Sequence, residues 1–510
     1  MKRIEIYKLL LLTLISIVLA SCFNSKSKEK PNIILIYVDD LGYGDVSSYG
    51  ATSVQTPNVD FLANNGLRFT DAHCTAATCT PSRFSLLTGI YAFRNNAAIL
   101  PGDAPLLIDT AALTLPKWLQ GEGYNTAVVG KWHLGLGRGT IDWNNQITPG
   151  PAEVGFNYSY IVPATTDRVP CVYVENGKIV NLDPADPIEV SYKGPFDDSP
   201  TGLSNPELLK MDADSQHSNF IINGISRIGF MKGGKSAYWK DEDMADVLTG
   251  KAITFIQQNK KKPFFLYFAL PDIHVPRAPN ERFIGKTTMG RRGDMIAEMD
   301  WMVGAIVDEI KKQGLAKNTL IIFTSDNGPV LDDGYMDQAE KLVGSHDPSG
   351  GFRGGKYSAY EAGTRMPTIT YWPGKINSGV SSAVISQVDF FASLSSLVSK
   401  NGIGNLQNDG QNYIDALMGK SDIGRDVLLE ESFTFSVRMD NWKYIAPMEK
   451  KTPDWLRNKK IETGLSQEDQ LYDLAKDPKE QVNMADKYPD IVKKLKGELE
   501  KIKITKTVKR

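Results

Sequence analysis

PNIILIYVDD, residues 31–40, is the stretch that decides the fold. Its centre is a continuous apolar run in which the β-branched residues isoleucine and valine predominate. An apolar run of this length without polar alternation predicts a strand that is buried on both faces, as in a parallel sheet. The run ends in Asp39 and Asp40, which places two adjacent carboxylates at the carboxyl end of the predicted strand.

The same design recurs along the chain. Three further apolar runs predict strands, at residues 124–129, 264–270 and 319–324, and they are followed by GKWH, PDIH and SDNG. Helical patterns lie between them, at residues 57–65, 115–122, 244–259 and 295–313. Strands that alternate with helices predict an α/β fold with a large, mostly parallel sheet sandwiched by helices.

Polar side chains follow each of these predicted strands at the point where the strand ends. They are Asp39, Asp40, Lys131, His133, His274, Asp326 and Asn327. Because open α/β sheets bind ligands outside the carboxyl ends of their strands, we expect these side chains to meet in one site.

The pattern changes near residue 405. Short strands are predicted at 427–430, 435–438, 443–445 and 471–474, and a helix at 489–504. We therefore expect a main domain over residues 31–404 and a smaller C-terminal α+β subdomain over residues 405–510. The chain has 510 residues, 58 of them basic and 60 acidic, so nothing in its charge favours nucleic acid binding.

The N-terminus predicts export. Lys2, Arg3 and Lys8 precede an apolar stretch at residues 9–20, which is typical of a signal peptide and short for a membrane span. The sequence LASC at its end resembles a bacterial lipobox. This resemblance implies removal of residues 1–21, a lipid on Cys22, a polar tether over residues 22–30 and anchoring to the membrane of the cell envelope, on the periplasmic or outer face. The alternative is an ordinary secretory peptide.

A second resemblance covers nearly the whole chain. The motif CTPSR at residues 79–83, followed by SLLTG, resembles the signature of the type I sulfatases, which are formylglycine-dependent members of the alkaline phosphatase superfamily. Further stretches resemble other motifs of that family, in the family's order: DDLGYGD (39–45), GKWHLG (130–135), SDNG (325–328), FRGGK (352–356), EAGTRMP (361–367) and LYDL (471–474). The resemblance implies a sulfatase catalytic domain over residues 31–404.

The resemblance implies two cofactors. Cys79 would be oxidised to formylglycine by a maturation enzyme, either a formylglycine-generating or a radical enzyme. Asp39, Asp40, Asp326 and Asn327 would hold one divalent ion together with the residue made from Cys79. Their hard oxygen atoms suit Ca²⁺, with Mg²⁺ as the alternative, better than they suit zinc.

The resemblance also implies catalytic roles. Arg83 and Lys131 would hold residue 79, and Lys356 would contact the sulfate. A hydroxyl of the hydrated aldehyde would attack sulfur, His274 would protonate the leaving oxygen, and His133 would deprotonate the second hydroxyl to release sulfate. The remaining histidines, His73, His217 and His346, are interpreted as structural, although His346 lies near enough to Lys356 in sequence to border the substrate.

The expected substrate is a sulfated glycan attacked at a chain end, such as a glycosaminoglycan, a mucin glycan or an algal polysaccharide. The long insertion at residues 162–235 is expected to be largely irregular and to carry the specificity. Two other functions remain open: a phosphoester hydrolase of the same superfamily, and a lipid-anchored glycan-binding protein without turnover. Pairing of Cys74 with Cys171 also stays open.

Overall fold

The computed structural model describes residues 30–196, 199–404, 408–448, 451–457 and 459–505. The predicted signal peptide (1–21), Cys22 and all of the predicted tether but Lys30 lie outside the described residues. No helix within the described ranges is long and apolar enough to cross a membrane.

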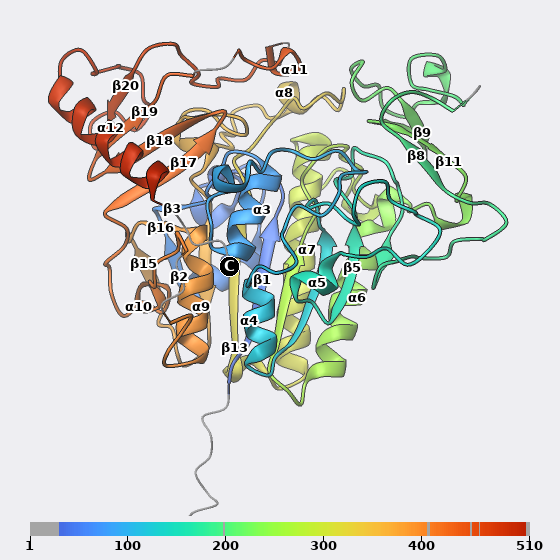
Figure 1. Cartoon of the computed structure of the whole chain (residues 1–510), viewed down its shortest axis with the longest axis horizontal. Helices are drawn as coiled ribbons and strands as arrows, with labels where there is room; N and C mark the ends of the chain where they lie inside the picture. Colours follow the sequence, from blue (N-terminus) through green and yellow to red (C-terminus); the bar gives the residue numbers. More distant parts are fainter. Residues whose placement is uncertain (1–29, 197–198, 405–407, 449–450, 458, 506–510) are drawn as a thin grey trace, which may run out of the picture.

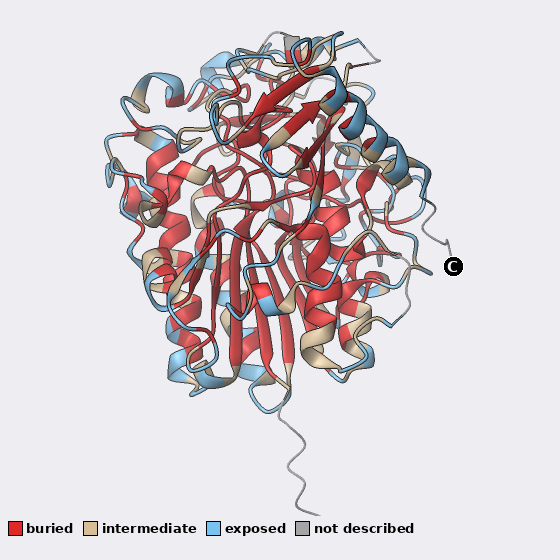
Figure 2. Cartoon of the chain, turned by 90° about the vertical axis from the view of Figure 1, so that its left-hand side faces the viewer, coloured by how far each residue is buried: buried red, intermediate tan, exposed pale blue. Residues whose placement is uncertain are grey.

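The predicted parallel strands form the centre of a ten-stranded sheet. β1 (Asn32–Val38) lies between β13 (Thr319–Ser325) and β12 (Phe264–Ala269), and β4 (Asn125–Lys131) and β5 (Tyr158–Val162) continue the sheet beyond β12. All four of these pairings are parallel. Every residue of β1, β12 and β13 is buried, as their unbroken apolar sequences require (Figure 2).

Short strands, most of them paired antiparallel, complete both edges of this sheet. β14 (Thr368–Tyr371) pairs antiparallel with β13 and with β2 (Leu67–Phe69), and β15 (Gly379–Ser381) closes that edge. At the other edge β6 (Val174–Glu175) and β7 (Lys178–Ile179) follow β5. The sheet is therefore mixed and mostly parallel in its centre, which confirms the predicted fold class.

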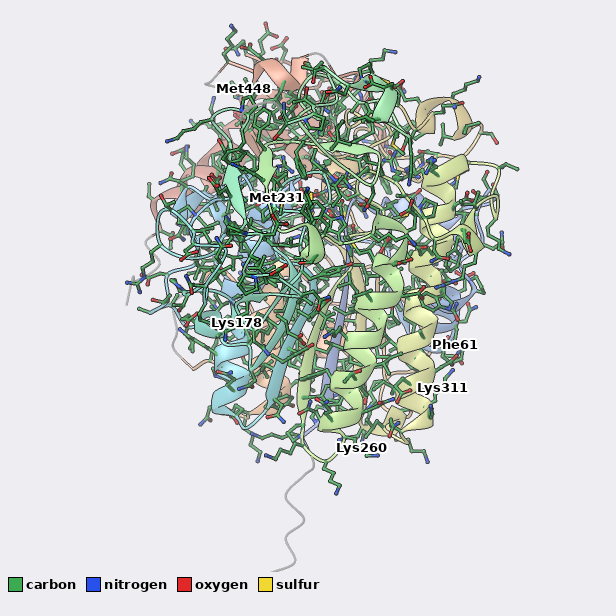
Figure 3. The ribbon with its side chains drawn as sticks, turned by 90° about the vertical axis from the view of Figure 1, so that its right-hand side faces the viewer. Phe61, Lys178, Met231, Lys260, Lys311 and Met448 are labelled. Carbon is green, nitrogen blue, oxygen red and sulfur yellow. The ribbon has the colours of Figure 1, made fainter. Side chains whose placement is uncertain are left out.

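Helices cover both faces of the sheet (Figure 1). On one face α7 (Gly290–Lys312) packs against α2 (Pro57–Asn65) and α6 (Met244–Asn259). α7 begins five residues before the predicted start at residue 295. Near its C-terminal end, α7 contacts α2 through Lys311, whose ammonium lies 4.1 Å from the centre of the Phe61 ring (Figure 3).

The opposite face carries α3 (Cys79–Thr88), α4 (Leu115–Gly121) and α9 (Phe390–Val398), which contact one another. All ten residues of α3 are buried, including Arg83. A fully buried helix that contains an arginine must bring that charge to a partner, because an unpaired buried charge is very costly. The partner lies in the site described below.

The C-terminal part forms a second, smaller layer. β17 (Val427–Ser432), β18 (Thr434–Met439), β19 (Trp442–Ile445) and β20 (Gln470–Asp473) make an antiparallel sheet, and α12 (Pro489–Ile504) packs on it. These elements match the predicted strands and helix closely. In Figure 1 this sheet lies over the end of the large sheet toward which the parallel strands run.

Buried ion pairs join the two layers. Arg438 of β18 binds Asp71 at 2.5 Å, and Lys443 of β19 binds Glu361 at 3.0 Å. His73 lies between Asp71, at 2.8 Å, and Glu430, at 3.0 Å. These contacts give His73 the structural role that we expected, and they fix the C-terminal sheet against the main domain.

The insertion at residues 162–235 is less irregular than expected. It contains two-stranded antiparallel pairs, β8 (Glu189–Ser191) with β11 (Phe230–Lys232) and β9 (Phe220–Ile222) with β10 (Ile225–Arg227). Their strands are only three residues long, which is too short for a periodic sequence pattern to predict them.

Candidate functional site

The side chains predicted to meet do so at the carboxyl edge of the large sheet. Asp39 and Asp40 directly follow β1, and Asp326 directly follows β13. The three carboxylates are buried, and each offers an oxygen atom within 4.8 Å of the others. Burial raises the pKa of Asp39 well above its usual value, and repulsion by Asp326 raises it further. Burial likewise raises the pKa of Asp40.

Asn327 adds a fourth oxygen atom. Its Nδ2 donates to Asp40 Oδ1 at 2.7 Å, which leaves its buried Oδ1 with no hydrogen-bond partner among the described residues. An acceptor buried in this way is destabilising unless it is satisfied. A hard divalent cation would satisfy it and would also relieve the repulsion between the carboxylates, so these residues fit Ca²⁺ or Mg²⁺.

Two buried cations neutralise the inner side of this cluster. Arg83 donates from Nε and Nη2 to Asp326 Oδ2 at 3.0 and 2.7 Å. Lys131, the last residue of β4, donates to Asp39 Oδ2 at 2.5 Å. Although burial alone would raise the pKa of Asp326, Arg83 and then Lys131 hold that pKa below its usual value.

Lys356 lies on the outer side. Its ammonium donates to Asp40 Oδ2 and to Asp333 Oδ2, at 2.9 Å each. Asp333 also binds the ammonium of Lys459 at 3.0 Å. Carboxylates and cations therefore balance across the site, so a bound divalent ion would make it net positive and suited to an anionic ligand.

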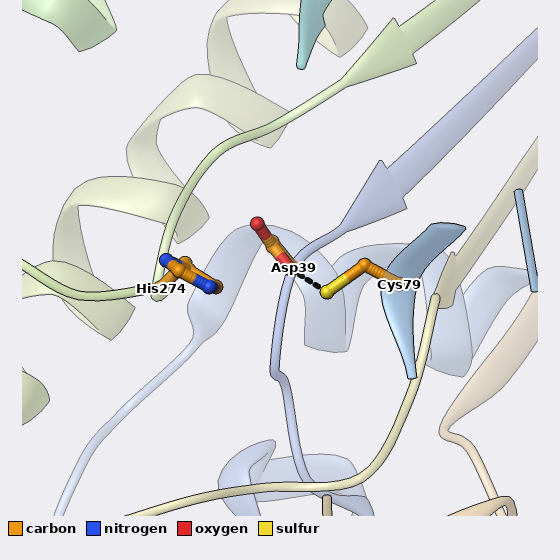
Figure 4. A group of neighbouring side chains, drawn as sticks. All are labelled: Asp39, Cys79 and His274. Atoms are coloured by element: carbon orange, nitrogen blue, oxygen red, sulfur yellow. Dashed lines mark hydrogen bonds between the residues drawn. The ribbon is translucent and has the colours of Figure 1, made fainter. Parts of the chain in front are cut away.

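Cys79 begins α3 and faces the carboxylates. Its Sγ lies 3.8 Å from Asp39 Oδ1, and only 3% of the residue is exposed. Figure 4 shows Asp39 just beyond the end of β1, between Cys79 and His274. Burial raises the pKa of the Cys79 thiol to about 12, so at neutral pH the side chain is an uncharged thiol.

The two predicted catalytic histidines lie at this edge as well. His274 Nδ1 is 2.6 Å from the Val275 carbonyl, and its Nε2 lies 3.9 Å from Asp40 Oδ2. His133 Nε2 is 3.0 Å from the Leu100 carbonyl. The nitrogen that faces a carbonyl must carry the hydrogen, which leaves the other ring nitrogen of each neutral imidazole as an acceptor.

The environment of both rings favours the neutral form. Burial lowers the pKa of His274, and Lys356 lowers it further. Burial also lowers the pKa of His133, with Lys131 as the next cause. His133 Nδ1 is buried and lacks a hydrogen-bond partner in the described part of the chain.

Strained backbone marks the same place. Asp40, His133 and Tyr357 have φ angles of 60°, 50° and 68°, in the left-handed region that residues other than glycine rarely adopt. Each such residue costs on the order of 1–3 kcal/mol and persists only where the surrounding structure enforces it. Strained backbone is therefore present at three positions around the carboxylate cluster.

A cavity of about 240 Å³ opens over this edge. Four of the predicted residues line it: Cys79, His133, His274 and Lys356. Arg83 and Lys131 are fully buried and do not line it, and they contact the carboxylates instead. The structure thus brings all the predicted site residues of the main domain to one place. The carboxylates with Arg83 and Lys131 form a buried inner layer, and the four lining residues form part of the cavity wall.

The cavity wall also contains residues that sequence reasoning missed. They are Asp167, Arg168, His217, Asp333, Trp455 and Lys459. His217 was expected to be a structural histidine, but it lines the cavity, 2.6 Å from Asp214 and 3.4 Å from Asp167. The adjacent charges of Asp167 and Arg168, at the start of the insertion, were the one local signal that could have revealed part of this wall.

Two expectations about other residues are resolved by the contacts. His346 binds Asp45 at 2.9 Å, beside the ion pair between Asp45 and Arg292, and it does not line the cavity. Cys74 and Cys171 are both free thiols, so the disulfide that the sequence left open is absent between them.

The model of the sulfatase family matches residues 31–400. An N-acetylgalactosamine-6-O-sulfatase of Bacteroides thetaiotaomicron is 49% identical over 484 residues, which cover 94% of this chain and 94% of that relative. Human arylsulfatase A is 30% identical over 506 residues, 94% of this chain and 89% of the relative.

Two solved structures are similar to this chain over nearly its whole length. A Bacteroides thetaiotaomicron protein, described in work on the metabolism of multiple glycosaminoglycans, has a TM-score of 0.90 at 49% identity and covers 94% of this chain and 100% of its own. A sulfatase from Pseudoalteromonas sp. has a TM-score of 0.69 at 25% identity, and the match covers 96% of this chain and 94% of that sulfatase. With these matches and the charged cavity described above, the chain belongs to the sulfatase family and is a sulfuric ester hydrolase.

Proposed function

We propose that this sulfatase removes 6-O-sulfate groups from N-acetylgalactosamine in a sulfated glycan, acting at a chain end. The observation that carries the sugar assignment is the 49% identity to an N-acetylgalactosamine-6-O-sulfatase over 94% of both chains. A concave wall of charged and aromatic side chains is in keeping with a sugar ligand.

Position 79 needs a better nucleophile than its thiol. A thiol is reactive mainly as the thiolate, and a pKa of about 12 leaves almost none of that form at neutral pH. We therefore propose that a formylglycine-generating or radical maturation enzyme converts Cys79 to formylglycine. The hydrated aldehyde would supply an attacking hydroxyl and a second hydroxyl that allows sulfate to leave.

A divalent cation, Ca²⁺ or Mg²⁺, is the second cofactor that we propose. Asp39, Asp40, Asp326 and Asn327 Oδ1 would hold it, because they offer four buried oxygen atoms, and Asn327 Oδ1 has no hydrogen-bond partner among the described residues. The ion would supply positive charge beside residue 79 and the sulfate.

The remaining side chains bind the anion and move protons. Lys356 would bind a sulfate oxygen, since its ammonium lines the cavity and is held in place by Asp40 and Asp333. Arg83 and Lys131 would keep the inner carboxylates ionised and in position. Fixed positive charge of this kind favours the charge that develops on sulfate oxygens as sulfur is attacked.

His274 and His133 suit opposite proton transfers. His274 would give a proton from Nε2 to the leaving sugar oxygen, after the bound sulfate ester raises the affinity of the ring for that proton. His133 Nδ1 would accept a proton from the second hydroxyl at residue 79. The Leu100 carbonyl supports this role, because it keeps the hydrogen on Nε2 and leaves Nδ1 free.

We also propose that the protein is exported and held at the cell envelope by a lipid on Cys22. The proposal rests on the N-terminal sequence alone. Growth with a radioactive fatty acid tests it: wild-type protein should carry the label in the membrane fraction, and Cys22→Ala should not. Label on the Cys22→Ala protein would contradict it.

The function is tested with the enzyme produced alongside a maturation enzyme. The substrates are 6-sulfated N-acetylgalactosamine, its 4-sulfated isomer, 6-sulfated N-acetylglucosamine, and a phosphate ester of N-acetylgalactosamine at position 6. We expect the first to be hydrolysed fastest. Faster hydrolysis of another sulfated sugar would overturn the sugar assignment, and hydrolysis of the phosphate ester alone would overturn the reaction.

Mass spectrometry of the peptide that contains Cys79 separates an enzyme from a glycan-binding protein. An active preparation should contain the aldehyde at position 79. If the host that naturally makes the protein leaves the thiol unmodified and no sulfated sugar is hydrolysed, the function of binding without turnover would replace this proposal.

A further inference from the structure

Three aromatic rings run from the cavity wall to the surface. Tyr357 directly follows Lys356, and its ring centre lies 5.0 Å from that of Trp455 and 6.4 Å from that of Phe433. The rings of Phe433 and Trp455 are 6.1 Å apart. Tyr357 and Trp455 line the cavity, and Phe433 is 39% exposed. We call these three side chains the aromatic platform.

The platform lies apart from the hydrophobic core clusters, although Tyr357 itself is buried. None of its rings is part of a hydrophobic core cluster of the described residues. Trp455 lies on α11 (Asp454–Arg457), a helix of only four residues, and is partly exposed. Aromatic side chains bury large apolar areas when they serve stability, so a group of three left at a cavity edge calls for another explanation.

Phe433 is the most informative of the three. It is the single residue between β17 and β18, where Ser432 pairs with Thr434, and its φ is 52°. Glycine or asparagine would suit this tight turn better, because both adopt positive φ at lower cost. A phenylalanine here is strained and also exposes its ring. The turn itself does not need that ring, whose only aromatic neighbours among the described residues are Tyr357 and Trp455.

The position of the platform identifies its ligand. Because Tyr357 is adjacent to Lys356, a sugar whose sulfate contacts Lys356 lies beside the platform. From Tyr357 the platform extends through Trp455, which also lines the cavity, to the partly exposed ring of Phe433. Pyranose rings present a face of C–H groups, which packs on aromatic rings while the hydroxyls remain in water.

We propose that the aromatic platform binds the monosaccharide next to the sulfated sugar, so that the enzyme prefers an oligosaccharide over a free sulfated monosaccharide. This inference rests on the proposed function, because it takes a sulfated glycan as the substrate. It adds a second sugar site, formed mostly by the C-terminal subdomain through Phe433 and Trp455.

The test compares two substrates, 6-sulfated N-acetylgalactosamine and a trisaccharide that ends in the same sugar. The variants are Phe433→Asn, which keeps a residue suited to positive φ but removes the ring, and Trp455→Ala. Val482→Ala is the matched control, since Val482 is 59% exposed in the same subdomain and lies outside the platform. Thermal unfolding of each variant is measured in parallel.

We expect wild-type enzyme to have the higher kcat/KM on the trisaccharide. Each platform variant should reduce this preference about 3- to 10-fold, mainly through KM, which is the scale of one aromatic contact. Phe433→Asn should unfold at the same temperature as wild type or higher, because it removes backbone strain. A purely structural role for Phe433 predicts the opposite, a lower unfolding temperature with the substrate preference intact.

The outcomes separate the two proposals. If the enzyme hydrolyses the monosaccharide but the platform variants keep the full trisaccharide preference, the second sugar site is overturned and the function stands. Equal losses on both substrates would also overturn the site, since the rings would then act on the sulfated sugar itself. If wild-type enzyme hydrolyses neither substrate, the proposed function fails and the platform proposal fails with it.

Discussion

Glu298 provides a pH-dependent test of the charges behind the site. It lies on α7, is 3% exposed, and borders a small cavity together with Asp272 and His274. Its Oε2 accepts a hydrogen bond from the Asn280 amide at 2.8 Å. Burial, and then repulsion by Asp272, raises the pKa of Glu298 from 4.5 to about 9.

The sign of the effect follows from which state holds the proton. Between the two pKa values the unfolded chain loses the proton of Glu298 while the folded protein keeps it, so rising pH favours unfolding. Each pH unit in this window removes about 1.4 kcal/mol of stability. At pH 7 the raised pKa of Glu298 lowers the free energy of unfolding by on the order of 3 kcal/mol, and below about pH 4.5 this loss of stability disappears.

Glu298→Gln should remove this cost. Its amide oxygen can still accept the hydrogen bond from Asn280, and the side chain cannot ionise. Urea unfolding followed by tryptophan fluorescence at pH 5, 6, 7 and 8 measures the difference. We expect the variant to be more stable than wild type, by a margin that grows toward about 1.4 kcal/mol per pH unit.

Glu281→Gln is the matched control, because Glu281 is exposed. Its stability should follow the wild-type profile at every pH. Parallel profiles for Glu298→Gln and wild type would refute the reasoning, since they would show that Glu298 ionises equally in both states. A variant that is less stable throughout would mean that the carboxyl is needed for a contact that an amide cannot make.

Three further predictions concern the active site. Asp326→Ala should abolish activity and destabilise the fold by about 3–5 kcal/mol, because it leaves the buried Arg83 without its main partner, and urea unfolding measures this loss. Addition of a chelator should lower the unfolding temperature of the wild-type protein, and Ca²⁺ should restore it. The unfolding temperature of Asp326→Ala should respond to neither. An identical response in both proteins would exclude a metal at Asp326. His274→Gln should lower kcat about 10²- to 10⁴-fold on a sugar sulfate but much less on 4-nitrophenyl sulfate, whose phenolate leaves without a proton donor; equal losses on the two substrates would contradict the role of His274.

The elements that were predicted well are those whose sequence pattern is local. The strand at residues 32–38 is apolar along its whole length, and the order of strands and helices leaves few arrangements other than a parallel sheet. The polar residues at the carboxyl ends of β1, β4, β12 and β13 could be predicted to meet because parallel strands end at one edge. The motif around Cys79 then indicated the chemistry of that edge.

The cavity wall could not be predicted in this way. Asp333 and Lys459 lie far apart in the sequence, yet they are 3.0 Å apart in the fold, and neither stands in a motif. The same holds for His217 and Trp455, which come from the insertion and from the C-terminal subdomain. No local pattern records a contact between segments that only folding brings together.

The sequence by itself determined the class of sheet, the edge where the site forms, the charged residues that meet there, and Cys79 as the proposed nucleophile. Each of these depends on periodicity or on residues adjacent in the chain, which a linear pattern can express. Only the tertiary structure decided the shape of the cavity, the neutral state of the Cys79 thiol, and the aromatic platform beside Lys356. These depend on burial and on distances between remote segments, and such quantities exist only once the chain is packed.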